Sequence, residues 1–318
     1  MLKDRSKLAG TPAVRLRHEI FVTVRAARAA KMIALLRNSA LVIPLVVQAW
    51  SAAAAQHGEW AAVNGTRLYY EQSGSGADIV LIHGTALDQR MWAPQVSALE
   101  PGFRVPRYDV RGFGRSDSTT SQHDPVADLI ALMDHLAIRR AHIVGMSMGG
   151  AIAADFVLAH PDRVLSLVLI ASNLGGFPPP SFGERFGPII AAEAKDLHAA
   201  KELWLHDLFM TPVHDSASVA AALRAIVTDC WCRQLVDRRL MPAQATPSAF
   251  DRLEAIRTAT LVINGVADDP DMLAIAKAVQ QRVRGAQSVR VPNAGHLVNL
   301  EQPAAVNDAL LAFIRAQL

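Results

Sequence analysis

From residue 56 to the C-terminus, short apolar runs alternate with longer segments of helical periodicity. A continuous apolar run is typical of a strand that is buried on both faces of a sheet. Such runs occur at 78–83, 141–146, 164–171 and 260–265. Apolar positions recur at helical spacing in the segments 125–137, 148–160, 272–283 and 303–317. This alternation predicts an α/β fold, with a mostly parallel sheet covered by helices on both faces.

Three weaker runs add strands to this prediction. They lie at 67–71 ("RLYYE"), 104–110 ("RVPRYDV") and 288–293 ("SVRVPN"). Pro106 has no N–H to donate to a neighbouring strand, so we expect it at a sheet edge or at a bulge.

One block interrupts the alternation. Residues 173–250 begin with "GGFPPPSFG" and continue with Ala- and Leu-rich segments, without any strand-like run. We therefore expect a helical cap at 173–250, inserted between two strands of a core built from 56–172 and 251–318. Insertions at the carboxyl edge of such a sheet can cover a site beneath them.

The first 55 residues have a different pattern. No Asp, Glu, Lys or Arg lies between Arg37 and Glu59, basic residues precede this stretch, and Ala53–Ala55 close it. This order predicts a secretory signal peptide cleaved near Ala55/Gln56, and hence an exported protein, periplasmic or secreted. An uncleaved membrane anchor is the alternative. Met32 would give a shorter leader of ordinary length.

Charge and cysteine content exclude several classes of protein. Residues 1–55 hold nine Lys and Arg against two Asp and Glu, so the remainder has 32 − 9 = 23 basic and 29 − 2 = 27 acidic residues. A mildly acidic folded part gives no reason to expect nucleic-acid binding. Cys230 and Cys232 are too few for a structural zinc site. A bridge between them would be strained, so we expect free thiols.

The stretch "HIVGMSMGGAIAA" (142–154) places Ser147 between Gly145 and Gly149, after a buried strand and before a helix. This is the setting of a nucleophile elbow, in which a sharp turn exposes the serine hydroxyl. The backbone N–H of Met148 would then lie at the helix start, where the helix dipole favours an anion.

Three further stretches fit the same chemistry. "LIHGTA" (81–86) ends a strand, and the N–H of Thr85 would be the second oxyanion donor. "NGVADDPD" (264–271) places carboxylates just after a strand, and His296 follows the last strand in "AGHLVNLEQP" (294–303). The chain order Ser, Asp, His is that of α/β-hydrolases and differs from that of chymotrypsin or subtilisin.

These stretches, together with "HGTALDQRMW" and "YDVRGFGRSD", resemble the α/β-hydrolase superfamily. Within it, the chain is similar to small bacterial serine carboxylesterases and 3-oxoadipate enol-lactonase-like hydrolases. The resemblance covers 60–172 and 251–318. The spacing Gly265-x-x-Asp268 matches the family's acid position, which implies that Asp268 orients His296, the general base.

The resemblance implies a serine hydrolase that cleaves a small apolar ester or lactone through an acyl-enzyme on Ser147, with no metal or organic cofactor. Two alternatives stay open. One is a hydrolase of carbon–carbon bonds in diketone-like compounds. The other is a ligand sensor on the same fold with slow turnover. No motif in 173–250 identifies the substrate, and none in the chain indicates the oligomeric state.

Overall fold

The structure is a computed structural model of the whole chain. It describes residues 58–118, 121–177, 191, 196–207, 217–230, 242–243 and 245–318. The chain divides into two compact units, 1–56 and 57–318, and every described residue belongs to the second. The predicted leader and its cleavage site therefore lie outside the described residues. Within the described part, no helix has both the length and the apolar character needed to cross a membrane.

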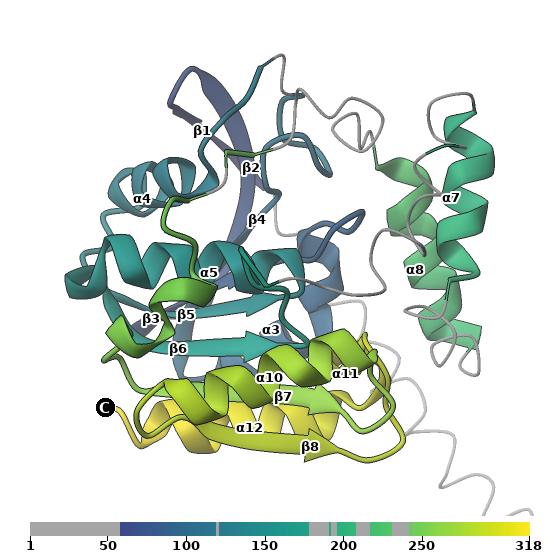
Figure 1. Cartoon of the computed structure of the whole chain (residues 1–318). Helices are drawn as coiled ribbons and strands as arrows, with labels where there is room; N and C mark the ends of the chain where they lie inside the picture. The colour runs from purple at the N-terminus through teal and green to yellow at the C-terminus, as the bar shows by residue number, and fades with distance from the viewer. Residues whose placement is uncertain are drawn as a thin grey trace, which may run out of the picture. The chain divides into compact units, whose positions relative to one another are not determined.

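An eight-stranded sheet forms the centre of the second unit, with the strand order β1-β2-β4-β3-β5-β6-β7-β8 (Figure 1). The strands are β1 (Glu59–Val63), β2 (Thr66–Ser73), β3 (Ala77–Ile82), β4 (Phe103–Tyr108), β5 (Ala141–Met146), β6 (Val164–Ile170), β7 (Thr260–Gly265) and β8 (Gln287–Val291). The pairs β1–β2 and β2–β4 are antiparallel, and every other neighbouring pair is parallel. The predicted mostly parallel α/β fold is confirmed.

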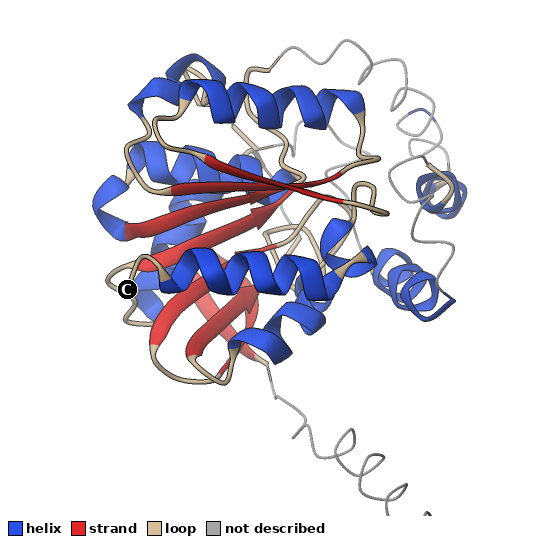
Figure 2. Cartoon of the chain, turned by 90° about the horizontal axis from the view of Figure 1, so that it is seen from below, coloured by secondary structure: helices blue, strands red, loops and turns tan. Residues whose placement is uncertain are grey.

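Helices cover both faces of this sheet (Figure 2). One hydrophobic cluster joins the sheet to α4 (Pro125–His135), α5 (Met148–Ala159) and α10 (Pro270–Arg282). The other joins it to α3 (Ala93–Leu99), α11 (Val298–Glu301) and α12 (Pro303–Arg315). Short 3-10 helices lie at η1 (Gln89–Trp92), η2 (Pro161–Arg163) and η5 (Phe250–Ala255).

The continuous apolar runs follow from this two-sided burial. In β3, Val80 and Ile82 belong to one cluster, whereas Ile79 and Leu81 belong to the other. Successive side chains of a strand point to opposite faces, so a strand covered on both sides needs apolar residues at every position. This is why the central strands could be predicted from the sequence.

The expectation for Pro106 was wrong. The proline lies in β4, an interior strand between β2 and β3, and pairs in register with Gln72 of β2. On the other side of β4, Arg104 and Arg107 pair with Asp78 and Leu81 of β3, and the two β4 residues between them are not paired with β3. The missing N–H of proline is thus accommodated by an interruption of one ladder instead of by an edge position.

Two described helices lie in the chain between β6 and β7, namely α7 (Leu197–Leu205) and α8 (Ala217–Asp229). They pack against each other, and α8 also contacts η1. An ion pair joins the end of α8 to η1, because the Arg90 guanidinium lies 2.9 Å from a carboxylate oxygen of Asp229. The Arg90 guanidinium also forms an ion pair with Asp88, at 2.6 Å from a carboxylate oxygen. The same side chain thus links this helix to the loop that follows β3.

The expectation of free cysteine thiols was wrong for Cys230. This residue directly follows α8, is buried, and is disulfide-bonded. Cys232 lies outside the described residues.

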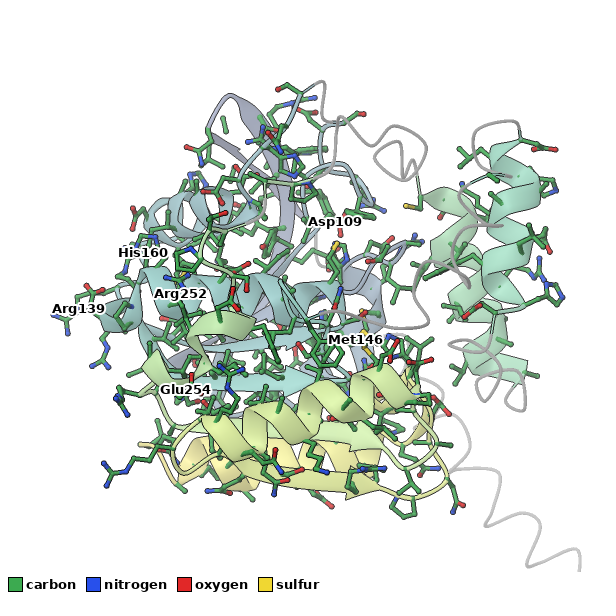
Figure 3. All side chains as sticks on the ribbon, in the orientation of Figure 1. Asp109, Arg139, Met146, His160, Arg252 and Glu254 are labelled. Atoms are coloured by element: carbon green, nitrogen blue, oxygen red, sulfur yellow. The ribbon has the colours of Figure 1, made fainter. Side chains whose placement is uncertain are left out.

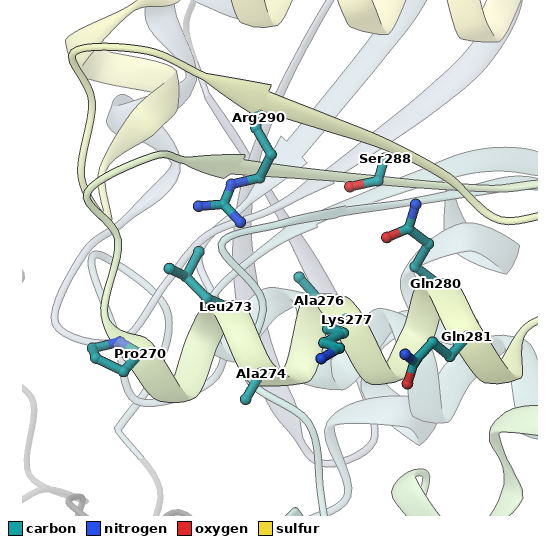
Figure 4. A pocket seen from close by; sticks show the side chains of 9 residues that line it. All are labelled: Pro270, Leu273, Ala274, Ala276, Lys277, Gln280, Gln281, Ser288 and Arg290. Atoms are coloured by element: carbon teal, nitrogen blue, oxygen red, sulfur yellow. The ribbon is translucent and has the colours of Figure 1, made fainter.

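A surface groove of about 580 Å³ lies between α10 and the edge strand β8 (Figure 4). Arg290 and Ser288 line it from the strand, and Lys277, Gln280 and Leu273 line it from the helix. None of the residues predicted for the reaction lines this groove.

Candidate active site

Residues with strained backbone lie just after the carboxyl ends of the parallel strands, which together form one side of the sheet, called here the carboxyl edge. Ala86, Ser147 and Ala171 follow β3, β5 and β6, and their φ angles are 58°, 51° and 44°. These three strands are neighbours. Non-glycine residues adopt such a conformation at a cost, and they cluster at functional sites. This edge is therefore the candidate active site.

Ser147 occupies the sharp turn between β5 and α5. Its N–H donates to the carbonyl of Ile170 at 3.0 Å, and its own carbonyl accepts the N–H of Asn173 at 3.1 Å. Two glycines make the turn possible. A Cβ on Gly145 would lie 2.1 Å from the carbonyl oxygen of Gly149, and one on Gly149 would lie 2.2 Å from that of Ile82. The predicted elbow geometry is thus present, with strand, turn and helix packed backbone to backbone.

The two predicted oxyanion donors belong to the start of α5 and to the loop that follows β3. Met148 is the first residue of α5, where backbone N–H groups have no partner within the helix. Thr85 lies in a turn closed by the N–H of Leu87 and the carbonyl of Gly84 at 3.3 Å. A Cβ on Gly84 would lie 2.8 Å from the Met146 sulfur and 3.4 Å from the Ser147 Cβ, so this loop lies against the elbow. Met146 is at the carboxyl end of β5 (Figure 3).

His83 bridges two loops and is fully buried. Its Nε2 accepts the N–H of Val110 at 2.9 Å, so Nδ1 carries the proton and donates to the carbonyl of Gly84 at 2.8 Å. Burial lowers the pKa of this histidine. The ring is therefore a neutral brace of the Thr85 loop, and both of its nitrogens are already engaged.

Asp268 and His296 meet directly. The imidazole Nδ1 lies 2.9 Å from Asp268 Oδ1, and both side chains are almost completely buried. Asp268 also accepts the amide of Asn264 and the N–H of Asp269, at 2.9 and 2.8 Å. Because the carboxylate can only accept, Nδ1 carries the proton, which leaves Nε2 as the basic nitrogen.

The neighbouring carboxylates have other places. Asp269 is the N-cap of α10, and its side chain accepts the N–H of Asp271 at 2.9 Å. Asp271 lies in the first turn of this helix and is buried. Of the three carboxylates, Asp268 therefore bonds to His296, whereas Asp269 and Asp271 lie at the start of α10.

Hydrogen bonds and an ion pair brace the loop "YDVRGFGRSD". Asp109 accepts the N–H groups of Gln89 and Arg115, at 2.8 and 2.7 Å. Burial, together with the charge of Asp88, raises the pKa of Asp109 to about 7. Arg111 forms an ion pair with Asp128 at 2.6 Å. These contacts fix the loop without reaching Ser147.

Among the residues that the structure describes, no group of three or more His, Cys, Asp or Glu side chains is arranged to hold a metal ion.

Comparisons with known proteins identify the family. The model of the alpha/beta hydrolase family matches residues 79–309. A putative carbamate hydrolase from Caulobacter sp. is 31% identical, over 79% of this chain and 96% of that protein. A putative non-heme chloroperoxidase from Synechocystis sp. is 31% identical, over 78% and 95%. The crystal structure of an enol-lactonase from Burkholderia xenovorans superposes with a TM-score of 0.67 at 27% identity, over 81% of this chain and all of that one. This chain therefore belongs to the alpha/beta hydrolase family.

Proposed function

We propose that this protein is a serine hydrolase that cleaves a small ester or lactone through an acyl-enzyme on Ser147. The observation that carries the proposal is the combination of a strained serine at the β5–α5 turn with a buried Asp268–His296 pair at the same edge of the sheet. A positive φ at a serine costs conformational free energy, and such strained residues cluster at functional sites. Activation of a serine hydroxyl requires an adjacent general base, and an imidazole that is paired through one nitrogen and basic at the other can serve as that base.

The first half of the reaction forms the acyl-enzyme. His296 Nε2 takes the hydroxyl proton of Ser147 while Oγ forms a bond to the carbonyl carbon of the substrate. The backbone N–H groups of Thr85 and Met148 stabilise the oxyanion, and loss of one such donor typically costs about 3 kcal/mol in the transition state. The proton then passes from His296 to the leaving alkoxide as the C–O bond breaks.

The second half releases the acid. Water loses a proton to His296, attacks the acyl carbon, and displaces Ser147 Oγ, which recovers its proton. Asp268 keeps the imidazole oriented and stabilises its cationic form in both halves. In a lactone the leaving alcohol stays attached to the acyl group, so a single hydroxy acid is released.

An apolar substrate is supported by the residues around this edge. Met146 and Ala171 belong to the same hydrophobic cluster as Leu205 of α7 and Ile226 of α8. The helices between β6 and β7 thus share one apolar cluster with the strand ends beside Ser147. The enol-lactonase of similar structure supports a lactone as one substrate class.

The experiment compares hydrolysis of p-nitrophenyl acetate and butyrate, and of simple aliphatic lactones by acid release, in the wild type and in Ser147→Ala. Ser97→Ala is the matched control, because Ser97 lies on the exposed side of α3. We expect the Ser147 variant to lose at least about 10³-fold in kcat/KM, as loss of a catalytic nucleophile does, and the control to be unchanged. Wild-type protein that hydrolyses none of these compounds would favour a carbon–carbon hydrolase or a slow ligand sensor.

A further inference from the structure

The loop that carries His296 is held against the loop that carries Asp268. The N–H of Ala267 donates to the carbonyl of Ala294 at 3.0 Å. A Cβ on Gly265 would lie 2.2 Å from the same carbonyl oxygen, so the two loops touch through their backbones. The same Cβ would lie 2.3 Å from the carbonyl oxygen of Gly295, so this side of the histidine loop is packed, and the N–H of Gly295 bonds elsewhere.

Glu301 accepts this N–H. It is the last residue of α11, it is half-buried, and its side chain turns back toward the loop. The N–H of Gly295 donates to its carboxylate and lies 3.1 and 3.0 Å from the two oxygens. The backbone of Leu297, on the other side of His296, also lowers the pKa of this carboxyl group. Glu301 thus accepts the N–H of the residue that precedes His296.

The electrostatic surroundings of Glu301 include the Asp268–His296 pair and two neutral amides. Asp268 and His296 both act electrostatically on its carboxyl group. From α3, the side chain that meets α11 is Gln95, which hydrogen-bonds to Asn299, and both are neutral amides. Burial and the charge of Asp268 raise the pKa of Glu301, whereas the N–H of Gly295 and the charge of His296 lower it. A negative charge near an imidazole favours the protonated form of such a ring in general.

We propose that Glu301 is a positioning residue for the reaction, which holds the His296 loop through the N–H of Gly295 and stabilises the imidazolium by its negative charge. This proposal rests on the proposed serine-hydrolase function. The imidazolium exists only while His296 holds the proton of Ser147 or of water, so a charge beside it lowers the barrier more than it affects substrate binding.

The experiment measures kcat and KM for p-nitrophenyl butyrate from about pH 5 to about pH 9 in Glu301→Gln, Glu301→Asp and Glu301→Ala, because kcat/KM reports the ionisation of the free enzyme. Glu254→Gln is the matched control. Glu254 pairs with Arg282 at the far end of α10, whereas Asp268 precedes its start, about 20 Å away along a helix of this length.

Glu301→Gln keeps an oxygen that can accept the N–H of Gly295 but loses the charge. We expect its acidic limb to move by about 0.5–1 pH unit toward lower pH, and its plateau kcat to fall about 3–10-fold with KM unchanged. Glu301→Ala also frees the loop, and its kcat falls by about 10²-fold, the usual scale for a misplacement of about 1 Å. Glu301→Asp restores the position of the limb, and Glu254→Gln matches the wild type.

A Glu301→Gln profile that superposes on that of the wild type, with kcat within about twofold, overturns the proposal. If the Gln and Ala variants do not fold, as judged by circular dichroism, Glu301→Asp decides: a limb at the wild-type position with reduced kcat supports the role, and a displaced limb contradicts it. Failure of the proposed function is separate, because wild-type protein would then lack Ser147-dependent hydrolysis altogether.

Discussion

The elbow gives a perturbation whose size can be worked out from the structure. In Gly145→Ala, the new Cβ would lie 2.1 Å from the carbonyl oxygen of Gly149, 2.4 Å from its carbonyl carbon and 2.6 Å from the nitrogen of Gly150. All three atoms are backbone, so no flexible side chain can move aside. Ordinary contact begins at 3.4 Å, and the first turn of α5 must therefore move by about 3.4 − 2.1 = 1.3 Å.

That displacement acts on the residues proposed for the reaction. Ser147 and Met148 stand between β5 and the turn that moves, so the hydroxyl and the oxyanion N–H shift together. A misplacement of about 1 Å costs roughly 10²-fold in rate, and overpacking costs about 1–3 kcal/mol in the free energy of unfolding. We expect kcat/KM to fall by about 10²-fold, in a protein that still folds.

The assay is hydrolysis of p-nitrophenyl butyrate, together with a urea unfolding curve for each protein. Gly102→Ala is the matched control, because a Cβ at Gly102 meets no atom within 4 Å. A Gly145→Ala variant with both the activity and the unfolding midpoint of the Gly102→Ala protein would refute the packing argument.

Three further predictions concern other parts of the chain. Burial lowers the pKa of His142 from 6.5 to about 4, so this histidine is neutral in the fold and contributes stability that is present above pH 6.5 and lost as the pH falls toward 4. Between pH 7 and pH 4.5, urea unfolding curves should show that the free energy of unfolding of the wild type falls by about 2 kcal/mol more than that of His142→Asn. This value follows from about 1.4 kcal/mol per pKa unit, with a discount for partial solvent access. Asp229→Asn removes the ion pair between Asp229 of α8 and Arg90, whose side chains are 62% and 38% exposed respectively. Amide hydrogen exchange of α8 should become faster, while the free energy of unfolding changes by less than about 1 kcal/mol because the pair is exposed. Unchanged exchange would contradict the link between α8 and η1. N-terminal sequencing of exported protein should begin near Gln56, and recovery of the intact leader in the membrane fraction would favour an anchor.

The strands that could be predicted are those with strong burial constraints. In β3, β5, β6 and β7 both faces are covered, so most positions are apolar and the runs are easy to recognise. The edge strand β1 was missed. Its sequence "EWAAV" has one buried residue and an exposed tryptophan, a pattern too weak to separate from a loop.

The candidate site was predictable in the same uneven way. Ser147, Thr85 and His296 follow strands or flank glycines, and these local settings have a recognisable physical reason. Glu301 has no such setting, because its carboxylate is important only through a loop that folds back onto it. The disulfide at Cys230 was mispredicted, since the local chain conformation of a close pair cannot be read from residue types.

The most direct test of the account is to identify the residue that a fluorophosphonate modifies. Wild-type protein is treated with the probe, digested, and mapped by mass spectrometry, alongside Ser147→Ala and Ser97→Ala. The account predicts a single adduct on Ser147, present in the wild type and in Ser97→Ala and absent from Ser147→Ala. An unlabelled wild type, or an adduct on another residue that persists in Ser147→Ala, would contradict the claim that Ser147 is an activated nucleophile.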